Sequence, residues 1–286
     1  MRKETITSGQ NLKIKQLLLL QEKSKARREQ GLFVVEGRRE LEHCLSAGYT
    51  VRSLFVCPEI ADASSFDSAG IYFSGQCPKN QIPAPSFLRH PSLTEASFIE
   101  IPEQLYRKVA YREGTEGIIA EVEYKSLKLL DLQLPENPLV MVLESVEKPG
   151  NLGAVLRSAD AAGADAVLIC DPLTDLYNPN LIRASIGAVF TVPTVACTSE
   201  EAIAFLQTKG IQILTAQLQD SSLYYDVDMR RGTALVMGTE ATGLTDQWRQ
   251  AASAHIRIPM LGRLDSLNVS VSAAILLFEA VRQRQG

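Results

Sequence analysis

The 286-residue sequence has little of what a disulfide framework or a metal centre requires. Its five cysteines are odd in number and widely spaced, without a C-x-x-C pair, and its three histidines are scattered. Neither pattern has the ligand spacing of a zinc site, and distant cysteines are more typical of reduced, buried thiols. We therefore expect no metal and no histidine triad. The residues concerned are Cys44, Cys57, Cys77, Cys170, Cys197, His43, His90 and His255.

Long apolar runs are also missing. The run of four leucines at residues 17–20 carries charge on both sides, and no other uninterrupted apolar stretch reaches spanning length. Such a run is too short for a signal peptide or a membrane span. The sequence therefore predicts a cytoplasmic protein that does not enter a membrane.

The chain lacks a net positive charge, since its formal charge is −4. The first 39 residues nevertheless carry ten basic and four acidic side chains. A local basic patch of this kind can contact RNA phosphates while the rest of the protein stays acidic, although a solvated helix face would look the same. The candidate RNA-binding residues are Lys23, Lys25, Arg27, Arg28 and Arg38.

The length and the 45% hydrophobic content suit two domains better than one. Proline and asparagine gather near residue 137, which predicts a linker over residues 126–137. We therefore expect a first domain over residues 1–125 and a second over residues 138–286.

Both parts are expected to alternate helices and strands. In the first part, a helix is predicted over residues 12–30. In the second, the apolar segment 138–146, the helix 154–164 and the strand 165–172 predict a β-α-β unit with a loop at the carboxyl end of its first strand. One helix is predicted over 180–190, and an amphipathic helix over 269–285 ends the chain.

The first of three unusual segments is NLGAVLR, at residues 151–157. Asn151 is suited to cap a helix whose first turns carry Arg157, and the two side chains would fall on one face. Arg157 could grip a phosphate with two hydrogen bonds. Alternatively, it could form an ion pair with Asp160 or Glu144.

The second segment is MGTEATGL, at residues 237–244. It leaves an apolar strand and enters two glycines, Gly238 and Gly243, which bracket Glu240. Glycines leave backbone amides and carbonyls accessible to a nucleoside. A plain tight loop would explain the pattern equally well.

The third segment runs from Ile258 to Ile275 and is the most specific of the three. Ser266 and Asn268 place a hydroxyl and a carboxamide at a helix start, where backbone N–H groups lack partners. An ordinary helix cap is the alternative interpretation. Apolar side chains that suit a flat ring stand nearby, namely Ile258, Pro259, Met260 and Leu267.

These three segments, in this order, resemble the signature motifs of the SpoU-type (TrmH-like) RNA 2′-O-ribose methyltransferases of the SPOUT superfamily. We refer to them as motifs 1, 2 and 3. The resemblance is dense over residues 138–283 and looser over the first part. It implies a parallel-sheet α/β domain with a trefoil knot, preceded by a smaller α/β, ribosomal-protein-like RNA-binding domain. It also implies S-adenosylmethionine as cofactor and a homodimer. Lys148 departs from an acidic residue found in many members.

The resemblance also assigns roles by position. Arg157 matches the catalytic arginine; because a guanidinium stays protonated, we expect it to position a phosphate and stabilise the developing alkoxide rather than act as a base. The other catalytic candidates are Asn151, Glu240, Ser266 and Asn268. The cofactor candidates are Thr215, Gly238, Glu240, Gly243, Ile258, Met260, Leu267 and Asn268.

Three other functions are weighed against ribosomal RNA methylation. Transfer RNA is also a substrate within the family, although an RNA-binding domain before the knot is more typical of ribosomal RNA enzymes. A catalytically silent RNA-binding protein would have lost cofactor contacts, whereas all three motifs are intact. A nicotinamide-dependent enzyme would need a G-x-G-x-x-G turn, which ESVEKPGNLGAVLR does not contain.

Overall fold

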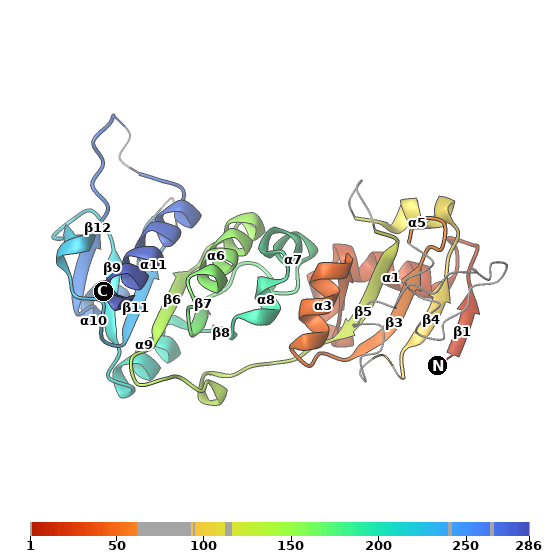
Figure 1. Cartoon of the computed structure of the whole chain (residues 1–286), viewed down its shortest axis with the longest axis horizontal. Coiled ribbons are helices and arrows are strands. Elements are labelled where there is room, and N and C mark those ends of the chain that lie inside the picture. The colour runs from red at the N-terminus through yellow and green to blue at the C-terminus, as the bar shows by residue number, and fades with distance from the viewer. Residues whose placement is uncertain are drawn as a thin grey trace. The chain divides into compact units, whose positions relative to one another are not determined.

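The structure, a computed structural model, describes residues 2–61, 93, 95–111, 116–239, 242–263 and 266–285. The chain forms two compact units. The first contains residues 1–125 together with 177–183, and the second contains residues 126–176 and 184–286. Each unit is built around its own β-sheet, as the alternating pattern of the sequence predicts (Figure 1). The functional domains expected from the sequence, over residues 1–125 and 138–286, stay a prediction.

The first unit contains a mixed five-stranded sheet with the order β1-β4-β3-β5-β2. Strands β1, β4 and β3 are parallel, whereas β5 runs antiparallel to both β3 and β2. Apolar side chains of α1 and α5 pack with alternate strand residues into one core. The elements of this unit are β1 (Arg2–Thr5), α1 (Leu12–Glu22), α2 (Ser24–Gln30), β2 (Leu32–Glu36), α3 (Arg38–Ser46), β3 (Val51–Val56), β4 (Ser97–Glu100), α5 (Glu103–Val109) and β5 (Ile118–Glu123).

The single helix predicted over residues 12–30 is wrong, because the chain breaks at Lys23. This residue adopts an extended conformation, with φ −113° and ψ 111°, between α1 and α2. The guanidinium of Arg27 stabilises the corner by donating to the carbonyl oxygens of Leu20 (2.7 Å) and Gln21 (3.1 Å). Arg27 is only 2% exposed, so it satisfies helix-end carbonyls instead of facing solvent. Burial of its guanidinium leaves little surface for a phosphate, and its role in RNA binding stays a prediction.

We expect Arg27→Met to lower the stability of the first unit by about 2 kcal/mol, because two buried carbonyls would lose a charged donor. Urea unfolding followed by circular dichroism measures this loss. Arg28→Met is the matched control, since the neighbouring Arg28 is exposed on the same helix. Equal stability of the two variants would contradict the structural role given to Arg27.

The second unit contains a seven-stranded sheet in which all neighbouring strands are parallel, with the order β10-β12-β9-β11-β6-β7-β8. The central strands are continuous apolar runs that are buried on both faces, which is typical of parallel sheets. The strands are β6 (Leu139–Glu144), β7 (Ala166–Cys170), β8 (Thr194–Cys197), β9 (Gln212–Ala216), β10 (Ser222–Leu223), β11 (Thr233–Met237) and β12 (Ala254–Arg257). This parallel α/β arrangement confirms the predicted fold class, whereas the trefoil knot stays a prediction.

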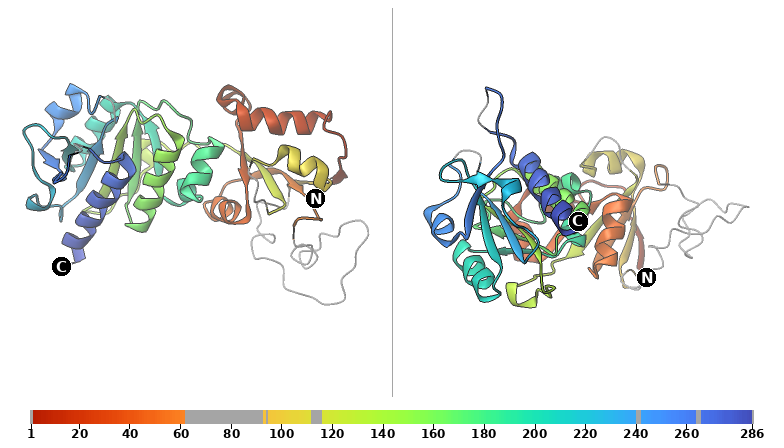
Figure 2. Two further views of the ribbon diagram at one scale, coloured as in Figure 1. Left: turned by 90° about the horizontal axis from the view of Figure 1, so that it is seen from above. Right: turned by 60° about the vertical axis from the view of Figure 1, so that its left-hand side comes forward.

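Helices cover both faces of this sheet (Figures 1 and 2). On one face, α6 and α11 lie side by side, and α11 also contacts β6 and β11. On the other, α9 and α10 supply Ala202, Leu206 and Trp248 to a core with side chains of β6, β7 and β11. The helices of this unit are α6 (Pro149–Ala161), α8 (Ala188–Thr191), α9 (Ser199–Thr208), α10 (Asp246–Ala251) and α11 (Val269–Gln285), and its short 3₁₀ turns are η3 (Leu129–Asp131) and η4 (Tyr224–Asp226). Helix α7 (Pro179–Ser185) lies mostly within residues 177–183, which belong to the first unit.

The helix predicted over residues 180–190 is also interrupted. Ile186 and Gly187 both have positive φ angles, 53° and 82°, and separate α7 from α8. A β-branched residue rarely adopts this conformation, so tertiary packing must impose it. Close to this break, the end of α7 approaches Gly153 of α6, where a Cβ atom would overlap Ala184. The close approach of these helices explains why residue 153 is a glycine.

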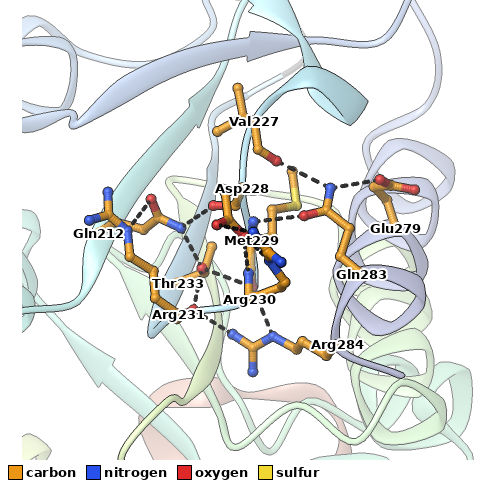
Figure 3. Close-up of polar contacts among 10 residues, drawn as sticks. All are labelled: Gln212, Val227, Asp228, Met229, Arg230, Arg231, Thr233, Glu279, Gln283 and Arg284. Carbon is orange, nitrogen blue, oxygen red and sulfur yellow. Dashed lines mark hydrogen bonds and ion pairs between the residues drawn. The ribbon is translucent and has the colours of Figure 1, made fainter. Parts of the chain in front are cut away.

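The carboxyl-terminal end of α11 is fastened to the segment before β11 (Figure 3). Arg284 donates to four backbone carbonyls, those of Met229, Arg231, Asn137 and Pro138. In the same cluster, Gln212 at the start of β9 donates to Thr233 at the start of β11 (2.7 Å). This cluster therefore lies at the amino ends of the strands. No helix within the described ranges is both long and apolar enough to span a bilayer.

Candidate cofactor and active site

A cavity of about 310 Å³ opens at the carboxyl ends of β9, β11 and β12. The last residue of each strand lines it, and the loops that follow supply most of the remaining wall. Ligands of open parallel sheets bind at this edge, because the chain leaves the strands there in loops. The lining residues are Ala216–Gln219, Met237–Thr239, Gly243, Leu244, Arg249, Ile256–Ile258, Met260, Ser266, Leu267, Val269 and Ser272.

The motif 2 loop forms one wall of this cavity. Thr239 and Gly243 exchange two backbone hydrogen bonds, of 3.2 and 3.0 Å, which close the loop at its neck. Gly243 has a φ of 68°, and a Cβ atom at Gly238 would overlap the Gly243 carbonyl. Both glycines are therefore required by the shape of the loop, and both also line the cavity. The two glycines can therefore form a tight loop and face a ligand at the same time. Glu240 lies outside the described residues.

Motif 3 supplies another part of the cavity wall and meets motif 1. Asn268 Oδ1 accepts from the backbone N–H of Ser270 (2.9 Å), so Asn268 caps α11 as the alternative interpretation expects. Its Nδ2 also donates to Asn151 Oδ1 (3.2 Å) on α6. Asn268 therefore joins the two motifs while it caps a helix. Four of the residues predicted for the site line the cavity, namely Ile258, Met260, Ser266 and Leu267.

The conformation of motif 1 differs in one respect from the prediction. Helix α6 begins at Pro149 with Lys148 as its cap, so Asn151 lies in the first turn and does not cap it. Its side chain is thereby available to Asn268. Proline is favourable at this first helical position, because its missing N–H would have no partner there.

Arg157 is exposed on α6, six residues after Asn151. Its proposed ion-pair partners are engaged elsewhere, since Asp160 accepts from Thr191 and Glu144 accepts from Thr245. Among the residues that the structure describes, Arg157 has no hydrogen-bond or ion-pair partner. The guanidinium is therefore available to a ligand on the side of α6.

Thr215 does not line the cavity. Its side chain is fully buried within β9, and its hydroxyl is hydrogen-bonded to Nδ1 of His255 on β12 (2.6 Å). Ala216, the next residue, reaches the cavity instead. This follows from strand alternation, which points neighbouring side chains to opposite faces.

Sequence reasoning missed two polar residues of the cavity, Gln217 and Arg249. Gln217 Oε1 and Arg249 Nε are buried without a hydrogen-bond partner among the described residues. Buried polar atoms are usually satisfied, so an unpaired acceptor and an unpaired donor in one cavity wall indicate a polar ligand. Gln217 directly follows the observed end of β9, at the edge where the chain leaves the sheet, whereas Arg249 lies on a helix that the sequence pattern did not reveal.

The four cysteines among the described residues do not line this cavity, and Cys77 lies outside those residues. Burial raises the pKa of Cys44 above its usual range and that of Cys57 to about 12. The hydrogen bond to Cys197, followed by burial, raises the pKa of Cys170. Thiols with raised pKa values stay protonated and are poor nucleophiles. Cysteine chemistry therefore has no evident part in this site.

The exposed members of the predicted basic patch lie in the first unit. Lys23, Lys25 and Arg28 are exposed at the α1–α2 corner, and Lys25 forms an ion pair with Glu29. Arg38 begins α3 and is half-buried. Three cations are thus accessible at this corner, whereas Arg27 is buried.

Comparison with known proteins assigns the family. The SpoU rRNA Methylase family matches residues 138–278, and an MRM3-like substrate binding domain matches residues 11–120. A 23S rRNA (guanosine-2′-O-)-methyltransferase RlmB of Ralstonia nicotianae is 34% identical over 228 residues, which cover 78% of this chain and 90% of the relative. The chain belongs to the SpoU rRNA methylase family.

Other relatives agree with this membership of the SpoU family. RlmB of Bordetella pertussis is 39% identical over 176 residues, which cover 60% of this chain and 72% of the relative. A crystal structure of an RNA 2′-O ribose methyltransferase has a TM-score of 0.77 at 35% identity, over 99% of this chain and all of the other. An AdoMet-bound rRNA methyltransferase from Sinorhizobium meliloti has a TM-score of 0.83 at 26% identity, over 98% of each chain. The predicted resemblance is confirmed.

Proposed function

We infer that this SpoU family member is an S-adenosylmethionine-dependent methyltransferase that modifies a ribose 2′-hydroxyl of ribosomal RNA. The observation that carries this conclusion is the meeting of the three motifs at one edge of the parallel sheet. Motifs 2 and 3 line a single cavity, and Asn268 joins motif 3 to Asn151 of motif 1. Cofactor and RNA sites would thus adjoin.

The cavity fits S-adenosylmethionine in size and chemistry. Ile258, Met260 and Leu267 offer apolar contacts for the adenine ring. Gln217 Oε1 can accept a hydrogen bond and Arg249 Nε can donate one, which suits a ligand with both kinds of polar group. Gly238 and Gly243 bring backbone groups close to it. When bound, S-adenosylmethionine supplies a methyl group on a positively charged sulfur, which is already an activated electrophile.

The residues of the chain then have to position the acceptor oxygen and stabilise its charge. The exposed guanidinium of Arg157 can hold an RNA phosphate with two hydrogen bonds and stabilise the alkoxide that develops as the 2′-hydroxyl loses its proton. Asn151 can orient the ribose, and Asn268 fixes the Asn151 side chain through their hydrogen bond. Ser266 and Glu240 would complete the reacting centre as the family pattern implies.

Ribosomal RNA is the substrate that the relatives favour. The RlmB relatives are named for the 23S rRNA guanosine 2′-O reaction, and one of them aligns over 90% of its length. We therefore propose a guanosine of the large ribosomal RNA as the target, with a transfer RNA as the alternative. We place the enzyme in the cytoplasm, where bacterial ribosomal RNA is made.

We propose that the enzyme is a homodimer, as the family resemblance implies. Val271 and Phe278 of α11 support this proposal, because they are 47% and 48% exposed although they are large and apolar. They stand seven residues apart, two turns along one face of the helix. An exposed apolar helix face favours association with a second protein surface.

The basic corner of the first unit should bind RNA phosphates. We expect the double substitution of Lys23 and Arg28 by glutamine to weaken RNA binding and to reduce the slope of log K against log salt by roughly 1 to 2. Filter binding at several salt concentrations measures the slope. Lys209 and Lys128, exposed in the second unit, provide a matched double substitution to glutamine as control. An unchanged slope in the Lys23 and Arg28 variant would contradict a role in phosphate binding.

The proposed substrate is tested by transfer of labelled methyl groups from S-adenosylmethionine to unmodified ribosomal RNA and transfer RNA in parallel. Label in 23S ribosomal RNA alone is the expected result. Label in transfer RNA alone would establish the alternative. Cofactor binding without label in either pool would contradict the ribosomal RNA assignment, and a chain that binds RNA but no cofactor would be a silent RNA-binding protein.

A further inference from the structure

Glu144, the last residue of β6, is a buried carboxylate to which neither the sequence motifs nor the proposed reaction gives a role. It is 2% exposed. Its Oε1 accepts from the Thr245 hydroxyl (2.6 Å), and its Oε2 accepts from the Thr245 backbone N–H (2.9 Å). A carboxylate that receives two donors from one residue fixes that residue in both position and orientation.

Thr245 stands where the motif 2 loop ends and α10 begins. Leu244, the preceding residue, is buried in the core, and Gly243 closes the neck of the loop against Thr239. The two backbone hydrogen bonds at the neck and the burial of Leu244 fix the loop at its own ends. The hydrogen bonds to Glu144 connect its end to the central strand β6, from which the motif 1 loop also leaves. Motifs 1 and 2 therefore share this anchor.

A second set of hydrogen bonds surrounds the same carboxylate. Trp248 Nε1 on α10 donates to Ser199 Oγ (2.9 Å), and Ser199 Oγ donates to Asp171 Oδ2 (2.6 Å). Ser199 Oγ lies 3.4 Å from Glu144 Oε1. Helix α10 is thus held at Thr245 and again at Trp248, three residues later.

Helix α10 carries Arg249, the residue after Trp248, into the wall of the cavity. The motif 2 loop carries Gly238 and Gly243 into the same wall. Both pieces of the wall depend on where Thr245 lies. Glu144 itself does not line the cavity, so any influence on a ligand must pass through these two pieces.

We propose that Glu144 is a positioning residue for the cofactor site, acting through Thr245 to hold the motif 2 loop and Arg249 in the geometry that binds S-adenosylmethionine. The proposal rests on the proposed function, since it takes that cavity as the cofactor site. Glu144 does not contact the reacting atoms. Its loss should therefore weaken cofactor binding more than it slows the reaction at saturating cofactor.

Two kinds of substitution separate this role from general stability. Glu144→Ala removes the whole anchor and should raise the dissociation constant for S-adenosylmethionine at least about tenfold. Thr245→Val removes only the hydroxyl at an exposed residue, and should raise that constant about fivefold, since the backbone hydrogen bond remains. Thr245→Ser restores the hydroxyl and should bind as the natural protein does.

Gln212→Met is the matched control, because it disrupts buried hydrogen bonds of the same sheet at its other edge (Figure 3). Gln212 donates to Thr233 and to the carbonyl of Asp228, and accepts from Arg231. These contacts lie at the amino ends of β9 and β11, whereas the cavity lies at the carboxyl ends. We expect Gln212→Met to lower the melting temperature while cofactor affinity stays unchanged.

Isothermal titration of S-adenosylmethionine into each full-length variant, with melting temperatures alongside, tests the proposal. We expect a raised dissociation constant for Glu144→Ala and for Thr245→Val. Thr245→Ser, which keeps the hydroxyl, should have the dissociation constant of the natural protein. Natural affinity in folded Glu144→Ala, or an equal loss in Gln212→Met, would overturn it. If Glu144→Ala does not fold, natural affinity in Thr245→Val overturns it. A natural protein that fails to bind S-adenosylmethionine would instead overturn the proposed function.

Discussion

Arg157→Ala should lose methyl transfer by at least about a hundredfold while its affinity for S-adenosylmethionine stays close to that of the natural protein. The reason is the location of the guanidinium. Arg157 is exposed on α6 and is not among the residues that line the cavity. It can therefore act on the RNA and the acceptor oxygen without contributing to cofactor binding.

Rates under single-turnover conditions, with cofactor affinity measured by titration, separate these two effects. Arg157→Lys is the informative control, because it keeps the positive charge but cannot hold a phosphate with two parallel hydrogen bonds. We expect it to recover only part of the rate. Substantial turnover by Arg157→Ala would remove this residue from the mechanism, and a comparable loss of cofactor affinity would show that its role was misassigned.

Gly238→Ala should weaken cofactor binding at least about tenfold, because the added methyl group has no space. A Cβ atom at residue 238 would overlap the carbonyl of Gly243. The neck of the motif 2 loop would have to open, which would displace the backbone that faces the cavity. Because the strain is confined to one loop, the second unit should still fold, and the loss should be visible in titration.

Gly150→Ala is the matched control for this substitution. Gly150 lies in the first turn of α6, where a Cβ atom would meet no other atom within 4 Å. Alanine is also the better helix former, so we expect unchanged cofactor affinity and equal or slightly higher stability. Natural affinity in Gly238→Ala would show that the motif 2 loop does not shape the cofactor site.

Much of the second unit follows from local sequence pattern. The apolar strands β6, β7 and β11 and the terminal helix α11 lie where the pattern predicts them, because long apolar or amphipathic segments have few alternatives. The breaks at Lys23 and Ile186 do not follow from pattern. The first depends on hydrogen bonds from Arg27 to the carbonyls at the end of α1, and the second on a positive φ at Ile186, and a hydrophobic pattern reveals neither.

Some residues of the candidate site could likewise be predicted from the sequence, and others could not. The glycines and apolar residues of motifs 2 and 3 could be predicted, since their chemistry is visible in the sequence. Thr215 could not be excluded from the cavity, because its direction depends on how β9 lies between β11 and β12. Arg249 and Glu144 become visible only when α10 is placed against the carboxyl end of β6. Short polar helices such as α10 carry too weak a pattern to be recognised.

The most direct test of the central claim is the position of the transferred methyl group. Unmodified 23S ribosomal RNA is incubated with the full-length protein and labelled S-adenosylmethionine, and the product is then hydrolysed in alkali. A methylated 2′-oxygen blocks cleavage of the adjacent phosphodiester, so label retained in alkali-resistant dinucleotides is the predicted result. Label released entirely as mononucleotides would place the methyl group on a base and contradict the account.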